Sequence, residues 1–207
     1  MVSVRLTHER LDTRGVREAA ALSARAYRND PFFAYVYATA PYRERSIENL
    51  HRAVFAPRSV MRRTVVARDL DGVIVGVALW VAPGGFPPSL TEQLRQTPRN
   101  VLALRGHRGA LARGMSYQHQ VLASHPREAH WYLWSLTVDP SVQGHGIGTQ
   151  LVVEGLQVAD HDHVGVHLET QNPDNLGFYE RFGFTRSHVV QPLPTAPPLF
   201  AMWRNAH

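Results

Sequence analysis

The fold is decided by six residues, Gln143-Gly144-His145-Gly146-Ile147-Gly148, which lie between a predicted strand and a predicted helix. His130–Val138 is rich in aromatic and β-branched residues, and Thr149–Asp160 has the apolar spacing of an amphipathic helix. A glycine turn at the start of a helix points backbone N–H groups and the positive end of the helix dipole outward, and this arrangement binds phosphate. Because glycine turns also make plain strand-to-helix connections, the segment alone leaves both interpretations open.

The spacing of the glycines separates several classes of phosphate-binding protein. Gly144, Gly146 and Gly148 alternate with single residues, whereas the dinucleotide-binding fingerprint has the spacing G-x-G-x-x-G. All 22 basic residues are arginines, so the chain has no lysine for a Walker P-loop, a Schiff base or a lysine general base. These observations argue against a Rossmann oxidoreductase and exclude a Walker-type nucleotidase.

The remaining pattern predicts helices and strands that alternate along the chain. In the N-terminal part we expect helices over Thr13–Tyr27, Arg43–Phe55 and Ser89–His119, and a strand pair over Arg63–Arg68 and Val73–Val81. After the glycine turn we expect a strand over Gly165–Thr170, a helix over Asn175–Phe182, and strands over Thr185–Val190 and Leu199–Trp203. This order indicates a mixed α/β fold built on one sheet.

Composition and length are those of an ordinary globular protein. With 207 residues, 44% hydrophobic and 19% charged, we expect one domain over 1–207, made of an N-terminal half (1–125) and a C-terminal half (126–207). No apolar run approaches the roughly 20 residues of a membrane span, and the first residues do not resemble a signal peptide. We therefore expect a cytoplasmic protein without membrane contact. The absence of cysteine excludes disulfides and thiolate chemistry.

Two motifs, in this order, resemble the signatures of the GNAT acetyltransferase superfamily. Gln143–Gly148 is similar to the signature Q/R-x-x-G-x-G/A, and Leu136–Pro140 looks like the strand that leads into it. Downstream, Asn172, Tyr179 and Gly183-Phe184 match the second signature, N-x-x-x-x-x-x-Y-x-x-x-G-F. The resemblance implies a mostly antiparallel sheet with one splayed parallel pair, flanked by helices. It also implies acetyl-CoA (coenzyme A) as the acyl donor and an amine as the acceptor.

A finer similarity is to the puromycin N-acetyltransferase-like branch of that superfamily. It rests on His130–Leu133, Val138–Pro140, Gln143-Gly144, Leu168–Thr170 and Phe178–Arg181. It implies a primary amine on a small molecule as acceptor, such as an antibiotic or aminonucleoside-like compound, and hence antibiotic resistance. Two alternatives remain open: an acetyltransferase that modifies a protein amine, and a non-catalytic module that senses acyl-CoA.

The family resemblance also assigns a cofactor site. In GNAT proteins the pantetheine arm of acetyl-CoA pairs with two splayed parallel strands, which here are Tyr132–Val138 and Val166–Thr170. The glycine turn would hold the pyrophosphate. The positions expected to bind the cofactor are Leu136, Thr137, Val138, Gln143, Gly144, His145, Gly146, Ile147, Gly148, Thr149, Asn172, Asn175 and Tyr179.

Catalytic roles follow from the same resemblance. Tyr179 lies seven residues after Asn172, as the acid tyrosine of the family does, and is expected to protonate the departing thiolate; the alternative is a packed structural tyrosine. Glu169 is the candidate base for the amine proton, and a structural or substrate-orienting carboxylate suits its position equally. His130 is a second candidate base, since the unperturbed pKa of histidine is near 6.5. An amine that arrives neutral needs no dedicated base.

The family resemblance implies that the aromatic segment after Asn29-Asp30-Pro31 covers the acceptor site. Phe32, Phe33, Tyr35 and Trp134 offer stacking surfaces for a flat or apolar amine. The alternative is that these rings pack the first helices onto the sheet. Sequence does not separate these two roles.

Other ligands and partners are not expected. His161-Asp162-His163 is the tightest cluster among the twelve histidines, but it has no further ligand nearby in sequence, so we predict no metal site. The net charge of +5 comes without a nucleic-acid-binding motif, so we predict no nucleic-acid partner. The family resemblance suggests a monomer or a homodimer.

Overall fold

The computed structural model describes residues 3–56, 61–191 and 193–207. Its strands are β1 (Arg5–His8), β2 (Arg62–Arg68), β3 (Ile74–Val81), β4 (His130–Val138), β5 (Gly165–Thr170), β6 (Thr185–Val190) and β7 (Leu199–Arg204). Its helices are α1 (Thr13–Ala26), α2 (Pro31–Val36), α3 (Ala40–Phe55), α4 (Leu90–Ala103), α5 (Ala110–Ser124), α6 (Ile147–His161) and α7 (Leu176–Glu180), with 3-10 turns at Pro140–Val142 and Pro173–Asn175. Within these ranges every helix is too short or too polar to cross a lipid bilayer.

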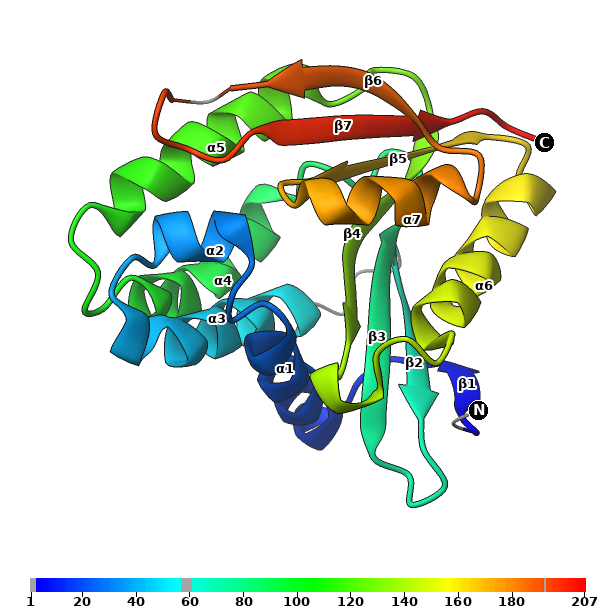
Figure 1. The fold of residues 1–207 in the computed structure, drawn as a ribbon, viewed down its shortest axis with the longest axis horizontal. Helices are drawn as coiled ribbons and strands as arrows, with labels where there is room; N and C mark the ends of the chain where they lie inside the picture. The colour runs from blue at the N-terminus through cyan, green and yellow to red at the C-terminus, as the bar shows by residue number, and fades with distance from the viewer. Residues whose placement is uncertain (1–2, 57–60, 192) are drawn as a thin grey trace.

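The strands form one sheet in the order β1-β2-β3-β4-β5-β7-β6 (Figure 1). Neighbouring strands are antiparallel except β4 and β5, which run parallel. The predicted mixed α/β fold, with a mostly antiparallel sheet, is therefore confirmed. Strand β1 is absent from the sequence-based prediction, because four residues of mixed burial give too little periodicity to recognise.

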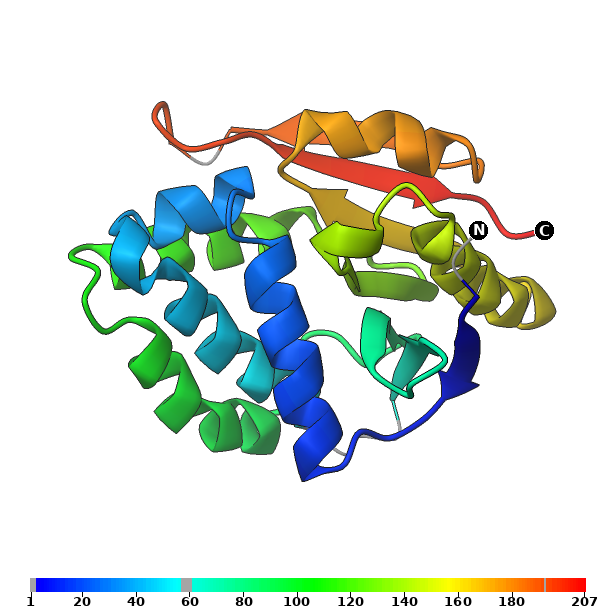
Figure 2. The ribbon, with the colours of Figure 1, turned by 60° about the horizontal axis from the view of Figure 1, so that its bottom comes forward.

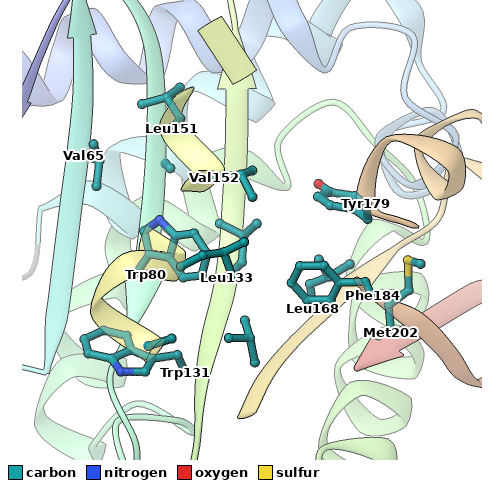
Figure 3. Close-up of a cluster of buried hydrophobic side chains, with 14 of the residues drawn as sticks. Val65, Trp80, Trp131, Leu133, Leu151, Val152, Leu168, Tyr179, Phe184 and Met202 are labelled. Atoms are coloured by element: carbon teal, nitrogen blue, oxygen red, sulfur yellow. The ribbon is translucent and has the colours of Figure 1, made fainter. Parts of the chain in front are cut away.

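Different helices cover the two faces of the sheet. On one face, Leu151 of α6 packs in a core with Trp80 of β3 and Trp131 of β4 (Figure 3). On the other face, Leu22 of α1 belongs to a core with Leu79 of β3. Because both faces are covered, β3 is buried along its whole length. Figure 2 shows α1 to α5 gathered on one side of the molecule and α6 on the other.

The single helix predicted over Ser89–His119 is wrong, because this segment contains two helices, α4 and α5. Gly106 and Gly109 lie between them with φ angles of 82° and 72°. Glycine adopts this left-handed conformation without steric cost, and it ends a right-handed helix. The break lets α5 run back to the sheet, where Tyr117 is buried with Leu199 of β7.

The predicted chain break at Asn29-Asp30-Pro31 is followed at once by a short helix, α2. The Asp30 carboxylate accepts hydrogen bonds from the backbone N–H groups of Phe32 and Phe33, at 3.0 and 3.4 Å. An aspartate that satisfies the free N–H groups of a first turn is a helix N-cap. This cap fixes where α2 begins, and so the direction of the helix that carries Phe32 and Phe33.

The packing of α6 against the sheet can be tested at Gly155. A Cβ atom at this position would lie 2.0 Å from Cε2 of the buried Trp80 ring. We expect Gly155→Ala to lower the free energy of unfolding by about 1–3 kcal/mol, because overpacking forces the ring or the helix to shift. Urea unfolding followed by tryptophan fluorescence measures this change.

Gly114→Ala in α5 is the matched control. The added Cβ would meet only Cγ1 of Val36, at 4.0 Å. We expect this variant to unfold at the wild-type urea concentration or slightly above it, because alanine restricts the unfolded chain. Equal midpoints for the two variants would show that α6 does not rest on Trp80.

Candidate active site

The parallel pair β4–β5 opens part-way along its length. The two strands pair only from His130–Leu133 to Gly165–Leu168. Beyond that point β4 continues to Val138 with β3 as its partner, and β5 continues to Thr170 with β7 as its partner. Figure 3 shows β5 leaving β4 at an angle. The predicted splay is confirmed, and the edge of β4 that faces β5 is left without a strand partner.

The glycine turn lies directly after the opened part of β4. Gly144 and Gly146 have φ angles of 80° and 83°, and Gly146 is the N-cap of α6. A Cβ atom at either glycine would have no heavy atom within 4 Å, so the space in front of both is open. Ile147 is buried in the core, which leaves its backbone N–H as its contribution to the turn. An anion can therefore approach the first N–H groups of α6 closely.

The end of α1 is tied to the opened part of β4. The Tyr27 hydroxyl donates a hydrogen bond of 2.9 Å to the carbonyl oxygen of Leu136. Arg25 forms an ion pair with Asp139, in which Nε lies 3.1 Å from Oδ2. These contacts hold the open strand in position where its neighbour β5 no longer does.

Tyr179 reaches the opening from α7. Its hydroxyl points toward β4 (Figure 3), and among the described residues it has no hydrogen-bond partner. Burial raises the pKa of the phenol, and the nearby ionisable groups of Tyr27 and Asp30 raise it further. The phenol is therefore neutral at neutral pH and can donate a proton.

A cavity of about 440 Å³ lies beside the opening. Its wall is rich in aromatic residues and contains the predicted residues Phe32, Phe33 and Trp134, together with Tyr179. Rings from the loop after β3 and from α3 and β4 complete the wall, including Phe86, His51 and Tyr132. Cavities of this size and character bind small molecules.

The predicted acceptor residue Tyr35 lies outside the set of residues that line this cavity. Tyr35 follows Phe32 by three positions and, like Phe32, packs against Tyr117 of α5. Its ring packs edge-on against Tyr117, with centroids 5.9 Å apart, and lies under the guanidinium of Arg113 at 5.7 Å.

Asp30 also lines the cavity, and the sequence analysis did not assign it to the site. Burial raises the pKa of this carboxyl, and hydrogen bonds from Phe33 and Phe32 lower it. The signal in the sequence was the dipeptide Asp30-Pro31, which marks a helix start but carries no information about the cavity.

Glu169 lies at the cavity wall with a side chain that is only 4% exposed. Burial opposes its ionisation, but its neighbours His125, His167 and Tyr132 outweigh this and lower the pKa of the carboxyl to about 2. Nε2 of His167 is 2.9 Å from Oε1. Such a carboxylate stays charged at neutral pH and accepts protons weakly.

His130, the second candidate base, lies outside the cavity lining. Burial lowers the pKa of its imidazole to about 4, and the charges of His125 and His167 contribute in the same direction. Its Nδ1 donates to the carbonyl oxygen of Glu128 at 2.7 Å. The ring is therefore held by Glu128 and does not line the cavity.

Several predicted cofactor residues hold the turn by their side chains. Nε2 of Gln143 donates to the carbonyl oxygen of Val138 at 3.1 Å, and Nδ1 of His145 donates to the carbonyl oxygen of Gln143 at 2.9 Å. Thr137 is buried and donates to Val77 O at 3.4 Å. Thr149 and Gly148 are half-buried in the first turn of α6. The contribution of this segment to a ligand is therefore mainly its backbone.

Asn172 and Asn175 organise the loop from β5 to α7. Oδ1 of Asn172 accepts a hydrogen bond of 3.1 Å from the Asp174 N–H, and Nδ2 of Asn175 donates to Oγ1 of Thr170 at 3.2 Å. Asn175 also lines the cavity. The loop thus sets the start of α7 and with it the position of Tyr179.

The segment His161-Asp162-His163 does not converge on a common point. Asp162 accepts a hydrogen bond from Nε1 of Trp131 at 2.9 Å, and Nδ1 of His163 bonds to the carbonyl oxygen of His207. Its side chains serve the fold at the end of α6.

The model of the Acetyltransferase (GNAT) family matches residues 23–184 of this chain. The chain belongs to the GNAT family. Members of this family use acetyl-CoA. The opened strand pair and the glycine turn lie within the matched range.

Relatives agree with this assignment at the level of the fold. The chain is 33% identical over 73 residues to Acetyltransferase Atu2258 of Agrobacterium fabrum; this covers 35% of the chain and 53%, about half, of that protein. A Corynebacterium glutamicum structure described as histone acetyltransferase HPA2 and related acetyltransferase has a TM-score of 0.73 at 23% identity, over 99% of this chain and 97% of that one. Arylalkylamine N-acetyltransferase 2 of Aedes aegypti has a TM-score of 0.60 at 13% identity, over 98% and 100%.

The glycine turn is tested by Gly146→Asp. Aspartate tolerates the left-handed backbone, but its carboxylate would stand beside the N–H groups that face an anion. We expect the dissociation constant for coenzyme A, measured by calorimetric titration, to rise by about tenfold or more, since like charges repel at short range.

Gly72→Asp is the control for charge and backbone strain. Gly72 has a φ of 79° in the β2–β3 hairpin, and a Cβ there also meets no atom within 4 Å. Its coenzyme A affinity should equal that of the wild type. If the Gly146→Asp variant binds coenzyme A as tightly as the wild type, the glycine turn is not part of the binding site.

Proposed function

We propose that this protein is an acetyl-CoA-dependent N-acetyltransferase that acetylates a primary amine of a small molecule by direct transfer. One observation carries the proposal: the unpaired edge of β4 runs from the glycine turn to the cavity beside Tyr179. A ligand with an anionic end and a reactive end can lie along that edge. Its anionic end would then meet the N–H groups of the glycine turn, and its reactive end would lie beside Tyr179. The family match supports the same ligand.

The residues along the edge suit acetyl-CoA. The backbone of Leu136 and Val138 would pair with the pantetheine arm, and the N–H groups of Gly144–Thr149 would hold the pyrophosphate. The open space at Gly144 and Gly146 supports this fit, because side chains there would block the approach. When bound, acetyl-CoA supplies an activated acetyl thioester.

The chain contributes a proton donor and hydrogen-bond donors to the reaction. Tyr179 is buried and neutral, so its hydroxyl can protonate a departing thiolate. Backbone N–H groups of the opened part of β4 can stabilise negative charge on an acyl oxygen, since no strand partner occupies them. Proton donation of this kind typically contributes about 10²–10⁴-fold in rate.

The cavity favours a small acceptor with an aromatic or apolar body. Phe32, Phe33 and Trp134 supply ring surfaces, and Asp30 supplies a carboxylate that attracts an ammonium group. The volume of about 440 Å³ lies within the range of about 300–1,000 Å³ typical of small-molecule sites. An aminonucleoside-like antibiotic such as puromycin combines an aromatic group with a primary amine and belongs among the candidate acceptors.

Glu169 acts in this proposal as a fixed negative charge in the cavity wall. Of the two roles that the sequence leaves open, base and orienting carboxylate, the second agrees better with a pKa of about 2. A base with so low a pKa would take a proton from an ammonium group slowly. The amine then loses its proton to water or arrives neutral.

The proposal is tested by calorimetric titration with acetyl-CoA and a thiol-release assay. The amine panel contains puromycin and phenethylamine as aromatic acceptors, spermidine as a purely aliphatic cation, and a lysine-containing peptide. We expect micromolar binding of acetyl-CoA and thiol release with an aromatic amine. Release only with the peptide would favour a protein acceptor, and binding without release from any amine would favour an acyl-CoA sensor.

The variant Tyr179→Phe tests whether the Tyr179 hydroxyl is the proton donor. We expect kcat to fall by about 10²-fold or more, with the acetyl-CoA dissociation constant within about twofold of the wild type. The melting temperature should be unchanged, because the hydroxyl has no hydrogen bond to lose among the described residues. Unchanged turnover in this variant would leave Tyr179 as a packing residue.

A further inference from the structure

A compact cluster of two histidines and a glutamate lies behind the cavity wall. His167 and Glu169 lie two residues apart on β5 and therefore point to the same face of the sheet. His125 directly follows α5, and its Nδ1 lies 3.7 Å from Oε1 of Glu169. One nitrogen from each histidine and one oxygen of Glu169 all lie within 4.8 Å of one another. We call these three residues the His–His–Glu cluster.

The cluster is buried, which makes its charge balance important. The side chains of His167, Glu169 and His125 are 0%, 4% and 10% exposed. Within the described part of the chain, the ion-pair partners of Glu169 are these two histidines, with no arginine among them. A buried carboxylate is costly unless a positive charge compensates it. That charge is either a protonated histidine or a cation.

The hydrogen bonds around His125 define which of its nitrogens carries the proton. The carbonyl oxygen of Glu128 only accepts, so Nδ1 of His130 must donate to it, at 2.7 Å. Nε2 of neutral His130 is then an acceptor, and Nε2 of His125, at 3.1 Å, is its donor. A neutral His125 therefore presents an unprotonated Nδ1.

That Nδ1 atom is buried and, among the residues that the structure describes, has no hydrogen-bond partner. It lies 3.7 Å from Oε1 of Glu169, which is too long for a hydrogen bond. Two lone pairs facing each other in a buried site repel, and a cation between them turns this repulsion into attraction. The bond from His125 to His130 also orients the ring through its second nitrogen, as the outer hydrogen bonds of metal-ligating histidines do.

We propose that His125, His167 and Glu169 bind one Zn²⁺ ion. Two histidines and one carboxylate are a donor set that Zn²⁺ takes, with its fourth position left for water or a substrate atom. Ligand atoms at about 2.0–2.1 Å from a tetrahedral Zn²⁺ lie about 3.3 Å apart. The distances of 2.9 and 3.7 Å from Oε1 of Glu169 to the two histidine nitrogens bracket this value. The two nitrogens lie within 4.8 Å of each other, so side-chain adjustment brings all three atoms around one ion.

The ion would join β5 to the connection between α5 and β4, and so fix the wall of the cavity. Glu169 would then be a metal ligand, and Asp30 would remain the carboxylate available to an amine. The site stands independently of acetyl transfer, since it is defined by its own three side chains.

The experiment uses tag-free protein treated with a chelator and then titrated with ZnCl₂, without acetyl-CoA. We expect one tight Zn²⁺ per chain by calorimetry and metal analysis, and a Co²⁺ derivative with the intense visible bands of a four-coordinate site. Zn²⁺ should also raise the melting temperature. Because the readout is metal binding, its failure is distinct from failure of the transferase assay.

Three variants locate the ion. His125→Ala and the isosteric Glu169→Gln should lose more than the roughly 10–100-fold in affinity that removal of an outer partner costs. His119→Ala removes an exposed histidine of α5 and should bind as the wild type does.

Two outcomes would overturn the proposal. One is the absence of stoichiometric binding to the wild type, which would leave a protonated histidine as the counter-charge of Glu169. The other is equal binding by wild type, His125→Ala and Glu169→Gln, which would assign the metal to surface histidines. If His125→Ala does not fold, Glu169→Gln and the Co²⁺ spectrum of the wild type decide between the outcomes.

Discussion

The loss of pairing between β4 and β5 after Leu133 and Leu168 is the constraint on which the rest of the site depends. Parallel strands that separate expose backbone groups that must find other partners. The sheet tolerates this because β4 keeps β3 and β5 keeps β7 as antiparallel neighbours along the open part. The opening is therefore a local change in a sheet that stays continuous on both outer sides.

The elements around the opening each fix one side of it. On one side, α6 begins at Gly146, and its apolar face is seated on Trp80 and Trp131. On the other side, Tyr27 and the ion pair of Arg25 hold the strand edge to α1. The anion-binding end of the site is thus rigid because a helix with a full core contact carries it.

The cavity combines apolar walls with two carboxylates that are stabilised in different ways. Asp30 is held by the N–H groups at the start of α2 and faces the cavity, where burial raises its pKa. Glu169 is held by histidines, and its pKa is lowered to about 2. One group is therefore available to respond to an incoming cation, while the other is committed to its neighbours in the wall.

The sequence by itself determined the features that depend on neighbours along the chain. The strand–turn–helix unit around Gly144 and Gly146, the mixed α/β order and the family signatures up to Tyr179 are local patterns, and the structure confirms the unit and the order. The prediction merged α4 and α5 into one helix, because glycines interrupt a continuous helical composition there, and it missed the short helix α2.

Only the tertiary structure decided which side chains meet. It left Tyr35 outside the cavity lining, brought Asp30 into it, and placed His125, which follows α5, beside Glu169 of β5. These contacts link segments far apart in the sequence, and no periodicity of 2 or 3.6 residues records them. The physical reason is that packing of α1–α5 against the opened sheet sets these distances, and that packing depends on the whole fold.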